Sequence, residues 1–249
     1  MKKIILKSNK NLEARVNIPI NSKKAIVIAH SFRNDMNEPA CLDVEKAFSK
    51  KRYAVLNFSF LGHGKSAGKL REVSWKSISE NISSAINYLR EKKFEKIGIY
   101  AISFGAIASV LSAEKPNAQV FLSPTPLYRP DGLLKRYKDS IRMEDLKTKG
   151  YSLAMSGSGR GGFEIGKEWI DEMQNEKGRV LRIHKQKKIP TLIIQGTKDP
   201  SYNQNIIKKF IETSKDKYFE IPSADHNFTD EKYRKIAINK ALEWFDKTL

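Results

Sequence analysis

The chain has 249 residues, of which 40% are hydrophobic and 30% are charged, and its formal net charge at pH 7 is +18. This length is sufficient for one domain with a full hydrophobic core, and no apolar run approaches the ~18 residues that a membrane span requires. The single cysteine, Cys41, excludes an internal disulfide and is typical of a protein in the reducing cytoplasm. We therefore expect a cytoplasmic protein without a membrane span, in which Cys41 is a small core residue.

The large positive charge does not by itself indicate a nucleic-acid partner. Lys and Arg are spread over the whole chain and are mixed with 28 acidic residues, whereas nucleic-acid-binding proteins concentrate them on one stripe with interleaved aromatic residues. The exception is the segment 177–188, which contains six basic residues and no acidic one. We interpret this segment as a solvated linker before a strand, with attraction of an acidic partner or substrate as the alternative. No nucleic-acid partner is expected.

Short apolar runs alternate with segments of helical periodicity along the chain. The expected strands are 2–7, 12–18, 25–30, 53–58, 97–102, 118–122, 191–195 and 217–221. The expected helices are 41–50, a long amphipathic one on Trp75, Ile78, Ile82, Ala85 and Leu89, a small buried one that continues to Ser109, one marked by Ile206, Ile207, Phe210 and Ile211, and a closing one from Tyr233 to Phe245. This alternation predicts an α/β fold with a mostly parallel central sheet and helices on both faces.

Residues 123–189 interrupt the alternation. The segment has no strong strand, five glycines between positions 157 and 166, and three prolines near its start, namely Pro124, Pro126 and Pro130. A structureless loop of this length is improbable inside a compact domain, so we interpret the segment as an inserted cap of short helices around a Gly-rich hairpin. The main domain then comprises residues 1–122 and 190–249.

The strand at 97–102 leads directly into the sequence Ala101-Ile-Ser-Phe-Gly105 and a small buried helix. A serine at the tip of a sharp strand-to-helix turn is typical of a nucleophile elbow, in which the residues two before and two after the serine must be small. Ala101 and Gly105 meet this requirement. The alternative is that Ser and Gly are present only because such turns favour them. The choice depends on whether an acid and a histidine follow in the right places.

An acidic residue and a histidine do follow, each directly after a predicted strand. Asp199 comes after the strand at 191–195, and His226 comes after the strand at 217–221. Because the carboxyl ends of parallel strands meet at one edge of a sheet, we expect Ser103, Asp199 and His226 to lie together. A serine nucleophile needs a base for its proton, and the base needs an acid to fix its tautomer. The pattern predicts a catalytic triad, with a turn role for Asp199 and a helix-capping role for His226 as the alternatives.

A tetrahedral intermediate requires two backbone N–H donors directed at its oxyanion. The residue after the nucleophile, Phe104, is expected to supply the first, at the start of a helix whose dipole favours negative charge. The loop after His30 is expected to supply the second, from the backbone of Phe32. We expect the side chain of His30 to brace this loop and to contribute to substrate binding. His63, in a Gly-rich turn, and His184, in the basic segment, fit the role of base less well.

Taken together, these motifs resemble the α/β-hydrolase superfamily, and within it the cinnamoyl (feruloyl) esterases and the monoacylglycerol-lipase-like, serine-aminopeptidase-like hydrolases. The similarity spans about residues 20–249. It rests on His30-Ser-Phe32, Phe60-Leu-Gly-His-Gly-Lys-Ser-Ala-Gly68, the elbow around Ser103 and Ala224-Asp-His-Asn-Phe228. Two positions depart from the family pattern, because Ser31 and Ala101 stand where the family has Gly.

The resemblance implies a serine esterase that transfers an acyl group to water. Ser103 attacks the carbonyl carbon of a small-molecule ester, His226 takes its proton as the base, Asp199 is the acid of the triad, and water hydrolyses the acyl-enzyme. No metal ion or organic cofactor is implied, and the sequence contains no Cys/His cluster or phosphate-binding loop. The alternatives are a serine aminopeptidase or acyltransferase with the same triad, and a non-catalytic hydrolase fold that binds a partner with its basic surface.

The strands before and after residues 123–189 both end on the catalytic side, so the cap is expected to pass over the Ser103 pocket. It carries apolar side chains suited to an acyl or aromatic group, namely Tyr128, Tyr137, Tyr151, Phe163, Ile165, Trp169 and Met173. Phe163, beside two glycines, is expected to face the pocket and to bind substrate together with Trp169. The alternative, which the helical spacing of Ile165, Trp169 and Met173 supports for these three residues, is that the side chains only pack the cap onto the main domain.

Overall fold

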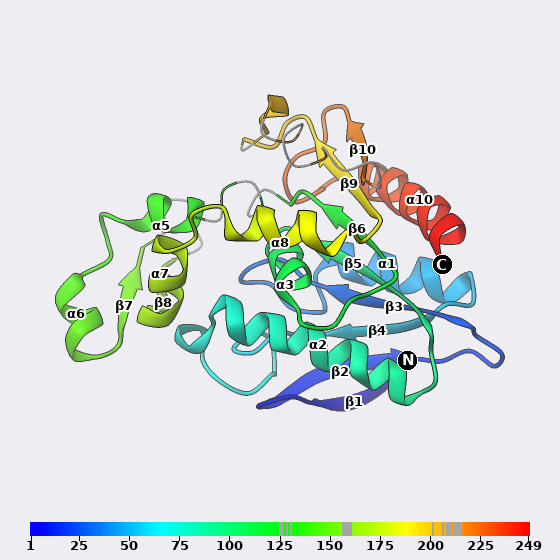
Figure 1. The fold of residues 1–249 in the computed structure, drawn as a ribbon, viewed down its shortest axis with the longest axis horizontal. Coiled ribbons are helices and arrows are strands. Elements are labelled where there is room, and N and C mark those ends of the chain that lie inside the picture. Colours follow the sequence, from blue (N-terminus) through cyan, green and yellow to red (C-terminus); the bar gives the residue numbers. More distant parts are fainter. Residues whose placement is uncertain are drawn as a thin grey trace.

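The fold is organised around one mixed sheet. The structure, a computed structural model, describes residues 1–124, 127, 129, 131–155, 161–200, 202–205, 207, 211 and 216–249. In this part of the chain the sheet has eight strands in the order β1-β2-β4-β3-β5-β6-β9-β10 (Figure 1). Their bounds are β1 (Lys2–Lys7), β2 (Asn11–Asn17), β3 (Lys24–Ala29), β4 (Ala54–Phe58), β5 (Lys96–Ile102), β6 (Ala118–Leu122), β9 (Thr191–Gly196) and β10 (Asp216–Ile221). The strands from β4 to β10 in this order run parallel, whereas β2 is antiparallel to β4 and β1 is antiparallel to β2.

The predicted mostly parallel sheet is confirmed, and the ends of its strands agree with the expected ones to within one residue. The central strands are buried on both faces, as their unbroken apolar runs predict. Ala29, at the end of β3, pairs with Phe58 of β4 on one side and with Ala101 of β5 on the other. This register brings the carboxyl ends of the three central strands to the same edge of the sheet, where the loops that follow them meet.

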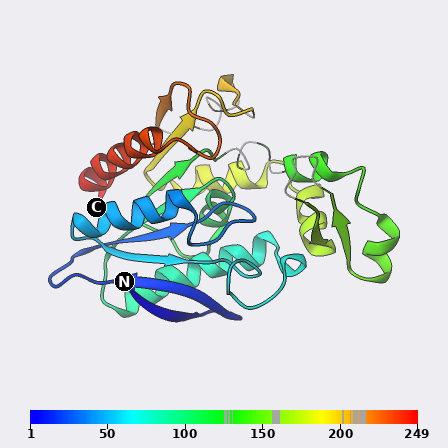
Figure 2. The same cartoon turned by 180° about the vertical axis from the view of Figure 1, so that it is seen from behind.

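Helices cover both faces of the sheet, as predicted. On one face α1 (Pro39–Lys50) packs against α10 (Glu231–Thr248) (Figure 2). On the other face α3 (Phe104–Leu111) lies between α2 (Trp75–Glu91) and α8 (Arg179–Lys187). The predicted apolar stripe of α2 is buried, which fixes this long helix on the sheet. Among the described residues, no helix is both long and apolar enough to cross a bilayer.

Residues 123–189 contain a small sheet and several short helices. Their elements are α5 (Gly132–Tyr137), α6 (Met143–Thr148), β7 (Tyr151–Ala154), β8 (Phe163–Gly166), α7 (Lys167–Gln174) and α8. β7 and β8 pair antiparallel and form a sheet of their own. The elements from α5 to α7 project from one end of the molecule in Figures 1 and 2. We refer to residues 132–174 as the lobe.

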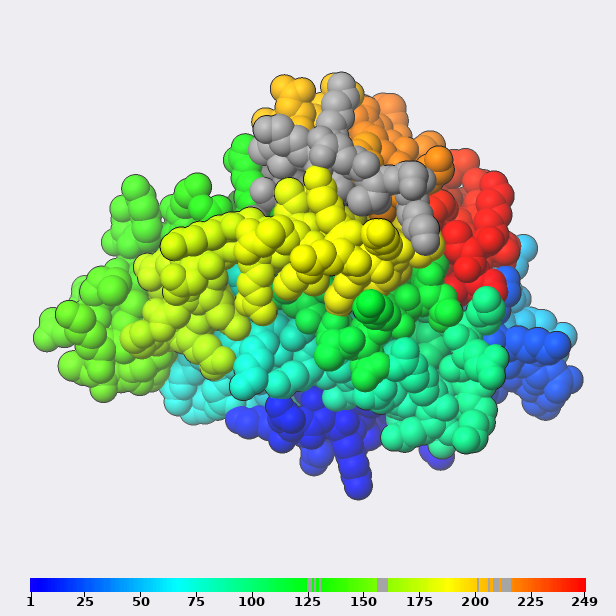
Figure 3. Space-filling model, viewed as in Figure 1, coloured from blue at the N-terminus to red at the C-terminus, as the bar shows by residue number. Residues whose placement is uncertain are grey.

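The basic segment 177–188 is not the expected linker. Nine of its residues form α8, with the side chains of Val180 and His184 buried, and the helix lies on the surface of the main body (yellow in Figure 3). α8 packs against α3 and leads almost directly into β9, so it serves as the crossover helix between the parallel strands β6 and β9. Four of the basic residues are exposed, namely Lys177, Arg179, Arg182 and Lys188, whereas Lys187 is partly buried and its Nζ donates to the carbonyl oxygen of Ser112 at the end of α3.

Several predicted features fall on residues that lie outside the described ones. These are Pro126, Tyr128 and Pro130, the glycines at 157 and 159, and Ile206 and Phe210 of the predicted helix at 206–211. Ile207 of the same predicted helix is described and is buried.

The lobe is attached to the main body along the segment 71–76. The Glu172 carboxylate in α7 accepts hydrogen bonds from the backbone N–H groups of Trp75 (2.5 Å) and Lys76 (3.1 Å), the first two residues of α2. Glu164 in β8 forms an ion pair with Arg71 at 3.0 Å. The backbones approach closely here, since a Cβ atom at Gly166 would lie 2.0 Å from the carbonyl oxygen of Arg71. Glycine is therefore required at this junction.

Candidate active site

Ser103 lies in the sharp turn between β5 and α3. Its backbone has φ 48° and ψ −104°, a conformation that residues other than glycine rarely adopt. Its N–H donates to the carbonyl oxygen of Leu122 at 2.8 Å, which fixes the turn to the end of β6. Gly105 is required, because a Cβ atom there would lie 2.7 Å from the carbonyl oxygen of Ala29. Position 101, two residues before the serine, also needs a small side chain, and the alanine there is fully buried.

The structure brings Ser103, His226 and Asp199 together in one series. Ser103 Oγ lies 3.1 Å from His226 Nε2, and His226 Nδ1 lies 2.6 Å from Asp199 Oδ2. An ionised carboxylate can only accept a hydrogen bond, so Nδ1 carries a proton and Nε2 faces the serine. The Asp199 side chain is only 1% exposed, whereas the imidazole of His226 is 30% exposed. The buried carboxylate thus fixes the tautomer and leaves the histidine accessible.

The loops after β9 and β10 approach each other closely. This approach brings Asp199, in the first loop, next to His226, in the second. Lys198 N–H donates to the Ala224 carbonyl oxygen at 2.9 Å, and a Cβ atom at Gly196 would lie 2.4 Å from the same oxygen. In addition, Gln195 Nε2 donates to Asp199 Oδ2 at 2.9 Å. We did not single out Gln195 from the sequence, although a polar residue at the end of an apolar strand was the available signal.

His30 lies beneath the loop that carries Phe32. Its Nε2 accepts a hydrogen bond from the N–H of Phe60 at 2.9 Å, and its Nδ1–H donates to the carbonyl oxygen of Ser31 at 2.7 Å. Burial, with a smaller contribution from the neighbouring His63, lowers the pKa of His30 to about 3, so the ring is neutral. The structure therefore places His30 in the bracing position. It does not place it against substrate, since the side chain is fully buried.

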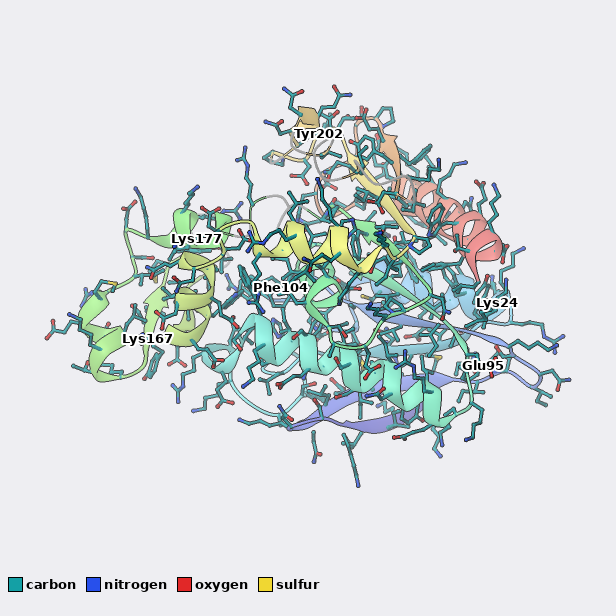
Figure 4. All side chains as sticks on the ribbon, in the orientation of Figure 1. Lys24, Glu95, Phe104, Lys167, Lys177 and Tyr202 are labelled. Atoms are coloured by element: carbon teal, nitrogen blue, oxygen red, sulfur yellow. The ribbon has the colours of Figure 1, made fainter. Side chains whose placement is uncertain are left out.

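The two residues whose backbone groups are predicted to bind an oxyanion have side-chain rings in contact. The rings of Phe32 and Phe104 are 5.4 Å apart, and Phe104 is the first residue of α3, where N–H groups have no intrahelical acceptor. Figure 4 shows Phe104 in the middle of the molecule, away from Lys24 and Glu95 at the amino ends of β3 and β5. One predicted donor thus belongs to the loop after β3 and the other to the start of α3, which follows β5.

His63 also belongs to this site, although we assigned it no role from the sequence. Its ring lies 5.9 Å from that of Phe32 and 6.0 Å from that of Phe104. Its Nδ1–H donates to the Leu61 carbonyl oxygen at 2.9 Å, and its Nε2 has no hydrogen-bond partner among the described residues. Burial lowers the pKa of His63, so this ring is also neutral. Its position between two aromatic rings was not readable from the Gly-rich turn in which it occurs.

A cavity of about 690 Å³ opens beside Ser103 and His226. Its wall comes from the loop after β3, the start of α1, the loop after β4 and the segment after His226, and it is rich in polar side chains such as Asn34, Asp35 and Glu38. Among the described residues, none of the lobe lines it. Among the residues that the structure describes, no group of three or more His, Cys, Asp or Glu side chains is placed to hold a metal ion.

Phe163 and Trp169 lie behind this wall. Phe163 is 5% exposed, and its ring packs 5.2 Å from Phe32 and 5.1 Å from Tyr137. The ring of Trp169 packs 5.2 Å from Phe32 and 5.6 Å from Phe104. The lobe therefore reaches the site through these ring contacts. The structure places both side chains in the packing arrangement that was the alternative expectation.

Comparison with known proteins agrees with this architecture. A family model described as acyl transferase matches residues 5–120, somewhat less than half of the chain. No curated protein matches the chain by sequence. Among solved structures, Est1E of Butyrivibrio proteoclasticus with bound ferulic acid is 19% identical with a TM-score of 0.80, and the match covers 98% of this chain and 99% of that one. The chain has the α/β-hydrolase fold.

Two further solved structures support this assignment. Mouse alpha/beta hydrolase domain-containing protein 10 is 18% identical with a TM-score of 0.73, and the match covers 99% of each chain. An esterase of Pyrococcus furiosus is 19% identical with a TM-score of 0.73, and the match covers 99% of this chain and 90% of that one. These matches extend over nearly the whole chain.

Proposed function

We propose that the protein is a serine hydrolase that cleaves carboxylic esters through an acyl-enzyme. The observation that carries the proposal is the hydrogen-bonded series of Ser103, His226 and Asp199, in which a serine that lines the cavity faces Nε2 of an oriented histidine. Nucleophile, base and orienting acid are the three parts that acyl transfer by serine requires. The esterase from Pyrococcus furiosus among the similar structures supports the same reaction class.

In the first half of the proposed reaction, Ser103 Oγ forms a bond to the ester carbonyl carbon while its proton moves to His226 Nε2. The carbonyl electron pair moves to the oxygen, and the N–H groups of Phe32 and Phe104 donate to the resulting oxyanion. When the intermediate collapses, the bond to the alcohol oxygen breaks and His226 gives its proton to the leaving alcohol. Water then repeats the sequence on the acyl-enzyme and releases the acid.

In this proposal the lobe affects the oxyanion site through its contacts with Phe32. Phe163 and Trp169 both pack on the ring of Phe32, whose backbone N–H is a proposed oxyanion donor. Because these contacts hold the loop from the outside, the two side chains act as supports of the oxyanion site. Their effect on substrate is therefore indirect.

Transfer of the acyl group to an acceptor other than water is the second candidate. The match of residues 5–120 to an acyl transferase model favours it, since this range contains both Ser103 and Phe32. Hydrolysis and transfer share the acyl-enzyme and differ only in the group that attacks it. Product analysis at increasing concentrations of an added alcohol or thiol distinguishes them, because a transferase releases its acyl group mainly to the acceptor.

Labelling with a fluorophosphonate tests the proposal, because this probe reacts with an activated serine. We expect the wild type to be labelled and Ser103→Ala to be unlabelled, with a loss of ester turnover of about 10⁶-fold. Ser109→Ala is a matched control on the same face of the sheet, because Ser109 is a buried serine of α3 that hydrogen-bonds to Gln119. An unlabelled wild type would contradict the proposal and favour a fold used for binding, whereas labelling that survives in Ser103→Ala would show that another residue is the nucleophile.

A further inference from the structure

Ser31 stands where the α/β-hydrolases that this chain resembles have Gly. Its backbone N–H and its hydroxyl group both donate hydrogen bonds to one carboxylate. Its N–H donates to Glu38 Oε1 at 2.8 Å, and its Oγ donates to Glu38 Oε2 at 2.7 Å. Asn34 Nδ2 also donates to Glu38 Oε2 at 2.7 Å and approaches Ser31 Oγ at 2.6 Å. One carboxylate therefore holds both ends of the loop 31–34, and Phe32 lies inside that loop.

The Glu38 carboxylate binds this loop and does not cap its own helix. Glu38 is the N-cap residue of α1, but its side chain makes no capping hydrogen bond, and the next residue, Pro39, has no N–H to offer. A fourth donor, Cys41 Sγ, lies 3.4 Å from Oε1. Burial raises the pKa of Glu38, and the hydrogen bonds from Ser31, Cys41 and Asn34 act in the opposite direction. The carboxylate is thus held by donors from the loop and the first turn of α1.

The peptide plane between Ser31 and Phe32 is held at its carbonyl oxygen, and Ser31 itself is held by Glu38. The carbonyl oxygen of Ser31 accepts from His30 Nδ1–H at 2.7 Å, while the N–H and Oγ of Ser31 are held by Glu38. In a planar trans peptide the N–H of one residue points opposite to the carbonyl of the residue before it, and the described chain has no cis peptide bond. The Phe32 N–H therefore points away from His30. Ser31 and Glu38 both line the cavity that contains Ser103.

We infer that Glu38 and Ser31 are positioning residues that aim the Phe32 N–H at the oxyanion of the acyl-transfer reaction. The inference rests on the proposed function, because an oxyanion exists only if Ser103 attacks a carbonyl group. A glycine at position 31 would retain the N–H bond to Glu38, but it would lose the Oγ bond and gain backbone freedom. Compared with glycine, the serine at position 31 restricts the backbone and adds a second hydrogen bond to the Glu38 carboxylate.

Steady-state kinetics on 4-nitrophenyl acetate, together with binding of a trifluoromethyl ketone, test this inference. The ketone adds to a serine hydroxyl and forms a bound oxyanion, so its affinity reports the oxyanion site directly. We expect Glu38→Ala to lower kcat about 10²-fold with KM changed less than about threefold, as for loss of one oxyanion donor. The affinity for the ketone should fall by the same factor as kcat/KM, because both depend on the oxyanion.

Two further variants and one control complete the experiment. Glu38→Gln retains the shape and one acceptor oxygen, and Ser31→Ala removes only the Oγ bond, so each should lower kcat about tenfold. If both side chains act through Phe32, the double variant Ser31→Ala/Glu38→Ala should be no slower than Glu38→Ala alone. Glu45→Gln is the matched control, because Glu45 is another carboxylate of α1 that binds Arg15 and Asn57 and does not touch the loop. It should lower stability and leave kcat unchanged.

The outcomes separate this inference from the proposed function. A wild type without turnover or labelling contradicts the proposed function, whereas an active wild type with unchanged kcat in the Glu38 and Ser31 variants overturns only the inference. A rise in KM at constant kcat also overturns it, because Glu38 would then contact substrate. Should Glu38→Ala fail to fold by circular dichroism, Glu38→Gln and Ser31→Ala still decide between positioning and structure.

Discussion

Among the described residues, two histidine–aspartate pairs lie at opposite ends of the same two strands. Asp199 and His226 follow the carboxyl ends of β9 and β10 and lie 2.6 Å apart. Asp216 is the first residue of β10, and its carboxylate lies 3.1 Å from His184 Nε2 in α8, the helix that precedes β9. Both carboxylates are almost fully buried. The two pairs therefore share residue types and a strand pair, and differ in what surrounds the imidazole.

The surroundings of the two imidazoles explain why only one pair is a candidate for catalysis. The His226 side chain is 30% exposed, and its second nitrogen faces Ser103. The His184 side chain is 3% exposed, and its ring packs 6.4 Å from that of Phe121. A buried His–Asp pair thus serves to join α8 to the edge of the sheet. Catalysis also requires an accessible imidazole and a nearby nucleophile. Of the two pairs, only the one at the carboxyl edge of the sheet has both.

Removing the charge of Asp199 should have the largest effect, and it tests whether the Asp199–His226 pair is the catalytic one. Asp199→Asn should lower kcat about 10⁴-fold while the protein stays folded, because an uncharged amide no longer sets the tautomer of His226. Ester turnover and circular dichroism measure the two effects. Asp225→Asn is the control, since Asp225 lies next to His226 but binds the backbone and hydroxyl of Thr229. Full activity in Asp199→Asn with loss in Asp225→Asn would show that Asp225 is the acid.

The second pair should respond in the opposite way. Asp216→Ala should reduce the free energy of unfolding by about 3 kcal/mol, because it removes one partner of a buried pair, and kcat should stay unchanged. Urea denaturation measures this loss. Asp171→Ala removes the exposed partner of Lys167 and should cost about 0.5 kcal/mol or less. Equal losses in the two variants, or a fall in kcat for Asp216→Ala, would remove the distinction between the pairs.

His30 extends the comparison to a buried histidine that stays neutral. Its pKa of about 3 in the folded state lies below the value near 6.5 of the unfolded chain, so below pH 6.5 the unfolded state binds a proton that the folded state does not. Stability is therefore lost as the pH falls. Between pH 7 and pH 5 the wild type should lose about 2 kcal/mol more than His30→Gln. Identical pH dependences in urea denaturation would contradict a neutral His30.

The smallest expected effect concerns the amide that supports Asp199. Gln195→Leu removes the 2.9 Å donor to Asp199 Oδ2 and should lower kcat about tenfold, which corresponds to about 1.4 kcal/mol of transition-state stabilisation. KM should remain constant, since Gln195 is buried and does not line the cavity. A change in stability without a change in kcat would assign Gln195 to structure alone.

The sheet could be predicted because buried parallel strands are unbroken apolar runs of a characteristic length. Ser103, Asp199 and His226 could be placed together because each follows such a run, and the register of the strands then determines their proximity. Glu38 and Gln195 could not be found in this way. Each acts through hydrogen bonds made in the folded chain, and neither belongs to a periodic pattern. The segment 177–188 was misinterpreted because its helix α8 buries only Val180 and His184, and its positive charges hide this short pattern.

The expectation for Phe163 shows a related difficulty. An aromatic residue beside two glycines is compatible with a pocket wall and with a packed interior, and only the partner rings distinguish the two. Phe163 meets Phe32 and Tyr137, which lie 131 and 26 residues away along the chain. Such contacts between distant segments leave no local signal in the sequence.

The hydrogen bonds of Glu172 have a consequence for how the protein folds. The first two N–H groups of α2 have no acceptor within their own helix, and the carboxylate that satisfies them comes from the lobe, about 100 residues later in the chain. The start of α2 and the lobe therefore complete each other and form one cooperative unit. In amide hydrogen exchange, the protection of Trp75 and Lys76 should depend on Glu172, so that Glu172→Ala lowers it even though the N-cap bond from Ser77 N–H to Ser74 Oγ remains.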